Sequence, residues 1–206
     1  KLDCPYVNFG ASHSVTVFDR VFVPWERVFL CGETELAGKL ALLFALYHRH
    51  SYTGCKAALS EIFTGATALA AEYNGIDKAQ HVRHKLAEMI QVVDLIYAAG
   101  LAAAVHATKT PSGTYVPDSN FCNAGRMLAG EKIYEEYEAL AAIAGGLVAT
   151  LPSEDDFYNE KTGPYLEKYI MRDPNVSAEH QHRAFRLFQD MMASAWGGHK
   201  LIDALH

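Results

Sequence analysis

The sequence lacks the features that define several large protein classes. Its four cysteines, Cys4, Cys31, Cys55 and Cys122, lie far apart and form no CxxC pair, which argues against a disulfide framework and against a zinc site built on paired thiols. No stretch reaches the roughly 18 uninterrupted apolar residues of a membrane span, and the first residues lack the charged-then-apolar pattern of a signal peptide. We therefore expect a cytoplasmic protein with reduced thiols and no membrane partner.

The sequence also has no long run of like charges. The 18 basic and 24 acidic residues give a net charge of -6, and no run of five or six like charges occurs, so we expect no nucleic-acid partner. The charged fraction is only 20%, which indicates extensive burial or an oligomer interface. A length of 206 residues allows one ordinary domain, or one domain and part of another. Because the chain begins with Lys inside an alternating pattern, we expect it to start within a larger protein.

Two patterns of apolar residues divide the chain. Residues 14–23, SVTVFDRVFV, mix β-branched and aromatic residues with polar breaks and end at Pro24, a pattern typical of half-buried strands. From about Thr34 to Asn74 the apolar residues recur at helical spacing, which predicts one long helix. We interpret 1–32 as the tail of a β domain and 33–206 as a helical bundle domain.

Three further helices are predicted in the bundle domain. The second is capped by Asp77 and runs to Pro111, where a connecting loop follows; the third runs from Asp118 to about Ala144 and is interrupted by Gly145 and Gly146. After a loop at LPSEDD and a short helical piece near 164–172, Ser177 caps the last helix, which continues to the end of the sequence. Four long helices with short connections predict a mainly α fold, an antiparallel bundle.

YHRHSYTGCK, residues 47–56, holds most of the chemistry in the first predicted helix. At 100° per residue, one helical face of roughly 100° contains His48, Tyr52, Cys55 and Lys56. His48 and Cys55 lie about 10.5 Å apart along the axis, which is too far to bind one zinc ion side by side but suits two corners of an iron-sulfur cluster. Arg49 and His50 point elsewhere. An idle cysteine in a buried helix, beside a histidine placed by chance, remains the alternative.

Five stretches resemble one enzyme family in order and nearly end to end. They are VFDRVFVPWERVFLCGE, YHRHSYTGCK, AAEYNG, KLAEMI and AIAGGLVATLPSEDDF. The sequence is similar to the 4-hydroxybutyryl-CoA dehydratase and vinylacetyl-CoA isomerase family, within the 4-hydroxyphenylacetate 3-hydroxylase superfamily. The resemblance covers the middle and C-terminal part of a typical member. It implies an acyl-CoA dehydrogenase-like C-terminal helical bundle preceded by the last strands of a β domain.

The same resemblance implies cofactors and ligands. Members are homotetramers that hold FAD and a 4Fe-4S cluster ligated by three cysteines and one histidine. His48 and Cys55 fall on two of these ligands, whereas the other two belong to an N-terminal region outside this sequence. Tyr52 and Lys56 fall on the active-site tyrosine and lysine, and the cluster-bound histidine is also the proposed base. The isolated chain is therefore expected to be inactive.

The implied reaction is dehydration of 4-hydroxybutyryl-CoA to crotonyl-CoA. The β-hydrogen is not acidic, so the resemblance implies loss of the α-proton and one electron, which makes the β-proton acidic before hydroxide leaves. Two positions depart from the family. His13 and Asp203 replace glutamates, which leaves the exact CoA ester open. Gly145 and Gly146 lie where related bundles let the backbone approach the flavin, although a helix end explains them equally well.

Two other functions stay open at this point. A flavin-dependent aromatic monooxygenase of the 4-hydroxyphenylacetate type shares the bundle but does not use the pair of His48 and Cys55. The second open function is that of a noncatalytic helical oligomerisation fragment, because a chain with two of the four cluster ligands is not expected to retain a cluster.

Overall fold

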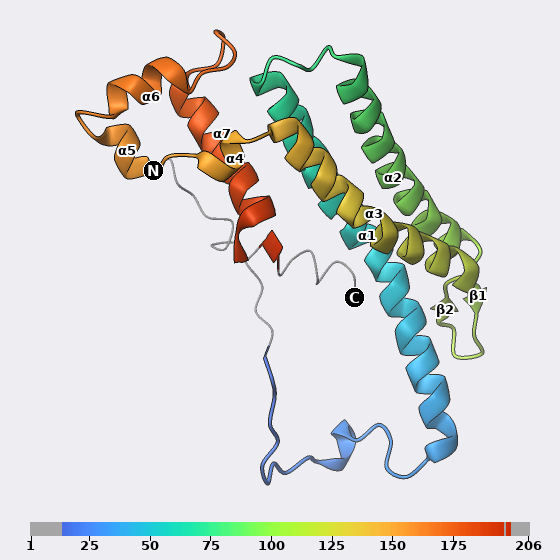
Figure 1. Cartoon of the computed structure of the whole chain (residues 1–206). Coiled ribbons are helices and arrows are strands. Elements are labelled where there is room, and N and C mark those ends of the chain that lie inside the picture. The colour runs from blue at the N-terminus through green and yellow to red at the C-terminus, as the bar shows by residue number, and fades with distance from the viewer. Residues whose placement is uncertain (1–13, 196, 199–206) are drawn as a thin grey trace.

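The computed structural model describes residues 14–195, 197 and 198, and this part of the chain is mainly helical, as the sequence predicts (Figure 1). Helices α1 (Thr34–Tyr73), α2 (Gln80–Val105) and α3 (Ser119–Ala144) pack against one another along much of their length. α2 runs antiparallel to the other two, because each connection reverses the chain. The mainly α fold class is confirmed.

The ends of α1 and α3 are those that the sequence predicts. α1 stops at Asn74, and Gly75 adopts a positive φ of 66° that favours glycine. The Asp118 side chain accepts hydrogen bonds from the backbone N–H groups of Asn120 (2.9 Å) and Phe121 (3.1 Å), which caps α3. At its other end, α3 stops at Gly145 with φ 72°. These local signals locate both helices along the chain.

The predictions for α2 and the segment after it are partly wrong. α2 begins after Ala79 without a side-chain cap, so Asp77 does not cap it. It ends at Val105, and a hairpin of β1 (Thr108–Lys109) and β2 (Tyr115–Val116) occupies what the sequence predicts as the helix end and a loop. Gly113 turns the chain with φ 89°. Two-residue strands are too short to produce an alternating pattern.

A second group of helices follows α3. It contains α4 (Leu147–Thr150), α5 (Glu154–Tyr158), α6 (Gly163–Tyr169) and α7 (Ala178–Ala193). Ser177 caps α7 as predicted, whereas LPSEDD, predicted as a loop, starts α5 with a capping box of Ser153 and Asp156. α7 contacts α4 and α6 and reaches α1 and α3, so it closes one end of a bundle made by α1, α2 and α3 rather than running along it as a fourth long member (Figure 1).

The buried residues form two clusters. The larger one joins the second half of α1, the first half of α2, the second half of α3 and helices α4 to α7, and its largest fully buried side chains include Phe185 and Phe188. The smaller one lies halfway along α1 and consists of Tyr52, Ala57, Ile96 and Ala129. The stretch of α1 singled out by its chemistry therefore has a core of its own.

The strands predicted in residues 14–23 are not formed in the described chain. These residues form no strand and bend at Asp19 and Arg20, and a 3-10 turn, η2 (Trp25–Arg27), follows. Phe22 and Phe29 remain 85% and 92% exposed. A strand needs a partner for its backbone hydrogen bonds, which the alternating pattern of one segment cannot supply. The proposed boundary between 1–32 and 33–206 remains a prediction.

One face of α2 is apolar and exposed. By length and composition alone α2 is apolar enough to cross a membrane, although a helix of a soluble bundle passes the same test. Its inner face packs on α1 and α3. Its outer face carries exposed side chains at helical spacing, namely Ile90, Tyr97, Leu101 and Val105. Exposed Asp94 lies on the same face, so the apolar side chains do not form an unbroken stripe.

Candidate functional site

Within the stretch 47–56, α1 packs closely against both α2 and α3. Thr53 is buried on α1 and faces a glycine on each neighbour: a Cβ on Gly125 would lie 2.8 Å from Thr53 Cγ2, and one on Gly100 would overlap Thr53 Oγ1. The two glycines therefore let the helix backbones approach. This close packing fixes the position of the residues next to Thr53 on α1.

Three side chains of the stretch 47–56 connect α1 to its neighbours. The Tyr47 hydroxyl donates to the carbonyl of Tyr115 (2.8 Å), and Arg49 Nη1 donates to Asn123 Oδ1 (2.8 Å). His50 Nε2 lies 3.1 Å from the carbonyl oxygen of Gly100 on α2. Arg49 and His50 are thus engaged in packing between helices, consistent with the prediction that they point away from the proposed working face.

Tyr52 is the buried centre of the candidate site. Its side chain is only 4% exposed, and two cations lie against its ring, Lys56 Nζ at 5.0 Å and Arg126 Cζ at 5.2 Å from the ring centroid. Both distances are within the range of a cation–π contact. Lys56 comes from α1 as predicted, one turn after Tyr52, whereas Arg126 comes from α3 and carries no signal in the sequence.

His48 and Cys55, the two predicted cluster ligands, are both exposed on α1. The His48 ring stacks on Phe44 with centroids 5.8 Å apart and an angle of 13° between the planes. Cys55 Sγ is 3.5 Å from the carbonyl oxygen of Tyr52. An accessible imidazole and an accessible thiol on one helix suit two corners of a cluster. Within the described residues no group of three or more potential metal ligands is present.

The remaining predicted site residues are two glycines that follow α3 and two residues beyond the described part of the chain. His13 and Asp203 lie outside the described residues. Gly145 and Gly146 follow α3, nineteen positions beyond Arg126, which corresponds to about 28 Å along the helix. The positive φ of Gly145 accounts for that glycine as a helix end. A Cβ on either glycine would meet nothing within 4 Å, so the backbone there is accessible.

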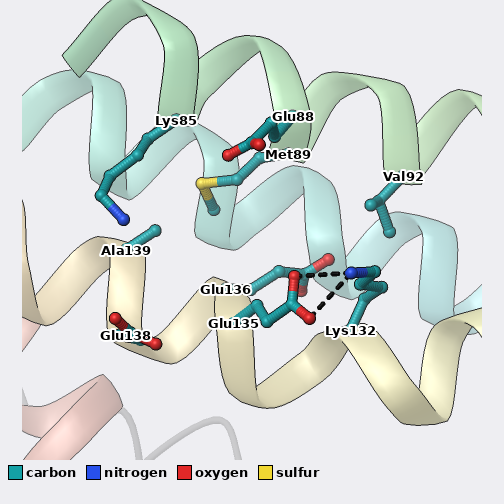
Figure 2. Close-up of a pocket in the computed structure, with 9 residues that line it drawn as sticks. All are labelled: Lys85, Glu88, Met89, Val92, Lys132, Glu135, Glu136, Glu138 and Ala139. Atoms are coloured by element: carbon teal, nitrogen blue, oxygen red, sulfur yellow. Dashed lines mark hydrogen bonds and ion pairs between the residues drawn. The ribbon is translucent and has the colours of Figure 1, made fainter. Parts of the chain in front are cut away.

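A pocket of about 220 Å³ lies between α2 and α3, and its lining does not include Tyr52 (Figure 2). Lys132 in its wall is paired with Glu135 at 2.7 Å. Its lining is rich in charged side chains and consists of Lys85, Glu88, Met89, Val92, Lys132, Glu135, Glu136, Glu138 and Ala139. Four carboxyl groups against two ammonium groups make this surface acidic on balance.

Glu136 is the unusual residue of the pocket. It is only 3% exposed, and its Oε2 atom has no hydrogen-bond partner in the described chain. Burial raises its pKa from 4.5 to about 7, since the charged form loses its hydration; a hydrogen bond with Ser60 opposes this shift, and nearby Glu135 adds to it. The sequence does contain a signal, because Glu136 takes a position in the buried series Ala129, Ile133, Glu136, Leu140 and Ile143.

The comparisons with known proteins place this arrangement in a family. The family model described as HpaB, 4-hydroxyphenylacetate 3-hydroxylase C terminal, matches residues 37–206. The chain belongs to this family. The family resemblance expected from the sequence is confirmed, and the match includes the stretch 47–56 and all of α1 except its first turn.

Two dehydratases are among the proteins to which the chain is similar. The chain is 36% identical, over 94% of its length, to 4-hydroxybutyryl-CoA dehydratase/vinylacetyl-CoA-Delta-isomerase of Clostridium aminobutyricum, of which it covers 41%. The oxygen-tolerant archaeal 4-hydroxybutyryl-CoA dehydratase of N. maritimus matches 92% of the chain with a TM-score of 0.86 and 38% identity, over 38% of that protein.

A solved monooxygenase of the HpaB family is almost as similar. The oxygenase component of 4-hydroxyphenylacetate 3-monooxygenase, in complex with FAD and 4-hydroxyphenylacetate, matches 92% of the chain with a TM-score of 0.83 and 33% identity, over 40% of that protein. The chain therefore spans about two fifths of the length of these relatives. They are enzymes, and flavin binding is found within the family.

Proposed function

We propose that this chain is the C-terminal part of a flavin- and iron-sulfur-dependent hydro-lyase. Its substrate would be 4-hydroxybutyryl-CoA or a related CoA ester, its product crotonyl-CoA, and vinylacetyl-CoA isomerisation a related activity. One observation carries the proposal: an exposed His48 and Cys55 flank a buried Tyr52 and half-buried Lys56 on one continuous helix. A relative that shares this part of the chain is a 4-hydroxybutyryl-CoA dehydratase/vinylacetyl-CoA-Delta-isomerase.

The residues on α1 fit an edge of a 4Fe-4S cluster. Cys55 would supply a thiolate and His48 an imidazole nitrogen, and both side chains are accessible from the same side of the helix. When bound, the cluster supplies a Lewis acid for the departing hydroxide, and FAD supplies a one-electron acceptor. The buried thiol of Cys122, with 0% exposure, does not suit a ligand.

The chain's own residues would handle protons and negative charge. An imidazole nitrogen of His48 would accept the α-proton, a role that requires the histidine to be released from iron. The Tyr52 hydroxyl and the Lys56 ammonium group would stabilise the negative oxygen that develops on the thioester. Asp203 would keep a carboxylate where the family has a longer one, and Gly145 and Gly146 would let the flavin approach.

We further propose that the parent protein is a cytoplasmic homotetramer. Support comes from the exposed apolar face of α2, whose side chains Ile90, Tyr97, Leu101 and Val105 contact nothing that would shield them in the described chain. Burial of these side chains between copies is favoured by the hydrophobic effect.

The experiment is anaerobic iron and flavin analysis of the full-length parent. The proposal expects about four irons per subunit, lost in Cys55→Ala but retained in Cys31→Ala, because Cys31 is exposed but does not match a family ligand. The 206-residue chain by itself is expected to hold no iron and to show no turnover, since two ligands do not retain a cluster.

A flavin-dependent phenol monooxygenase is the second candidate. It is favoured by the similarity to an oxygenase that binds FAD and 4-hydroxyphenylacetate. A wild-type parent that contains FAD but no iron would decide for this function and against the dehydratase. A parent with neither cofactor would leave the noncatalytic assembly module as the function of the bundle.

A further inference from the structure

Arg126 is placed against Tyr52 by a specific packing arrangement. Its guanidinium carbon lies 5.2 Å from the centroid of the Tyr52 ring, to which Lys56 adds a second cation at 5.0 Å. One turn further along α3, Gly130 leaves room for the guanidinium group: a Cβ there would lie 2.6 Å from Arg126 Nη1. Any side chain at position 130 would therefore displace the arginine from this position.

We propose that Arg126 is a positioning residue of the candidate site, which holds the Tyr52 ring so that its hydroxyl, together with the Lys56 ammonium group, meets a negatively charged substrate oxygen. The oxygen belongs to an enolate if the substrate is a CoA thioester and to a phenolate if it is a phenol. The inference rests on the proposed function in one respect, that Tyr52 meets the substrate.

The chemistry of the two cations explains why Arg126 would position the Tyr52 ring and Lys56 would meet the substrate oxygen. A planar guanidinium group stacks on an aromatic ring and keeps its charge at all accessible pH values, so it holds a ring in one orientation better than a flexible ammonium group does. Arg126 contacts the ring of Tyr52, and the hydroxyl is the atom that would reach the substrate. If Arg126 acts on the reaction through this contact, its effect depends on the Tyr52 hydroxyl, and a double-mutant cycle measures that dependence.

The test uses the full-length parent with its cofactors. Arg126→Gln is expected to lower kcat at least about tenfold while KM changes less, because positioning acts in the transition state. Arg126→Lys should recover part of the loss, and Gly130→Ala should reproduce part of it. In a Tyr52→Phe background, where the ring remains but the hydroxyl is absent, Arg126→Gln should have little further effect.

Two matched controls separate positioning from general packing. Arg172 lies over the ring of Phe185 at 5.6 Å, so Arg172→Gln removes the same kind of contact elsewhere and should leave kcat unchanged. Gly65→Ala adds a Cβ on α1 that meets nothing within 4 Å and should also be silent. Thermal melting of each variant reports any loss of stability.

Several results would overturn the inference. These are an unchanged kcat in Arg126→Gln, an equal loss in the wild-type and Tyr52→Phe backgrounds, or an equal loss in Arg172→Gln. The failure of the proposed function is observed independently, in the wild type: if it hydroxylates 4-hydroxyphenylacetate and does not dehydrate 4-hydroxybutyryl-CoA, the dehydratase is rejected. The cycle is then measured on the hydroxylation, where the phenolate replaces the enolate.

Discussion

Replacing Glu136 by glutamine should make the stability of the chain depend less on pH. The glutamine keeps the size of the side chain and its ability to bond Ser60, but it removes the ionisable group. In the wild type, the pKa of the buried carboxyl is raised from 4.5 to about 7. Between these two values the unfolded chain releases a proton that the folded chain keeps, so the wild type loses stability as the pH rises through this window.

The size of the effect follows from the two pKa values. The whole shift corresponds to roughly 3 kcal/mol of free energy of unfolding. The wild type has already lost about a quarter of this free energy of unfolding at pH 5. The increase in the free energy of unfolding that Glu136→Gln produces should therefore be roughly 2.5 kcal/mol larger at pH 8.5 than at pH 5. The low exposure of Glu136, 3%, means that solvent screening reduces this figure little.

Urea denaturation at both pH values, followed by circular dichroism, measures the difference. Glu138→Gln is the matched control, because Glu138 lines the same pocket from α3 but is exposed. Its effect on the free energy of unfolding should be the same at pH 5 and pH 8.5. If Glu136→Gln also changed the free energy of unfolding equally at the two pH values, the pKa of the Glu136 carboxyl would not be raised by burial, and the reasoning would be refuted.

Three further predictions concern packing, thiol chemistry and capping. Gly125→Ala should destabilise the chain by about 1–3 kcal/mol in urea denaturation, because its Cβ would lie 2.8 Å from a side-chain carbon of Thr53, whereas Gly65→Ala, with open space around its Cβ, should stabilise it by about 0.5–1 kcal/mol. In the cofactor-free chain at neutral pH, a chromogenic disulfide reagent should modify exposed Cys55 well before Cys122, since burial raises the pKa of the Cys122 thiol and blocks access to it. Equal rates of chromophore release from the Cys55→Ala and Cys122→Ala variants would contradict this. Asp118→Ala should cost about 1 kcal/mol, because two backbone N–H groups of α3 lose their acceptor, and Asp118→Asn should restore most of that loss in the same denaturation assay.

Features that depend on near neighbours could be predicted from the amino-acid sequence. The bounds of α1 and α3, and the start of α7, follow from helical spacing, from the caps Asp118 and Ser177, and from Gly75 and Gly145 at the helix ends. The face of α1 that carries His48, Tyr52, Cys55 and Lys56 follows from the 100° step alone. The family was also predicted correctly from the sequence, and the roles of these residues remain predictions.

Features that depend on contacts between distant segments were decided by the tertiary structure. The sequence does not show that Tyr52 is buried while His48 and Cys55 are exposed, because burial depends on which neighbour covers each side chain. Arg126, 74 positions after Tyr52, meets its ring only because α1 and α3 pack side by side with glycines at the closest points. For the same reason residues 14–23 have a strand pattern and no strand: the pattern is local, and the partner that a strand requires is not.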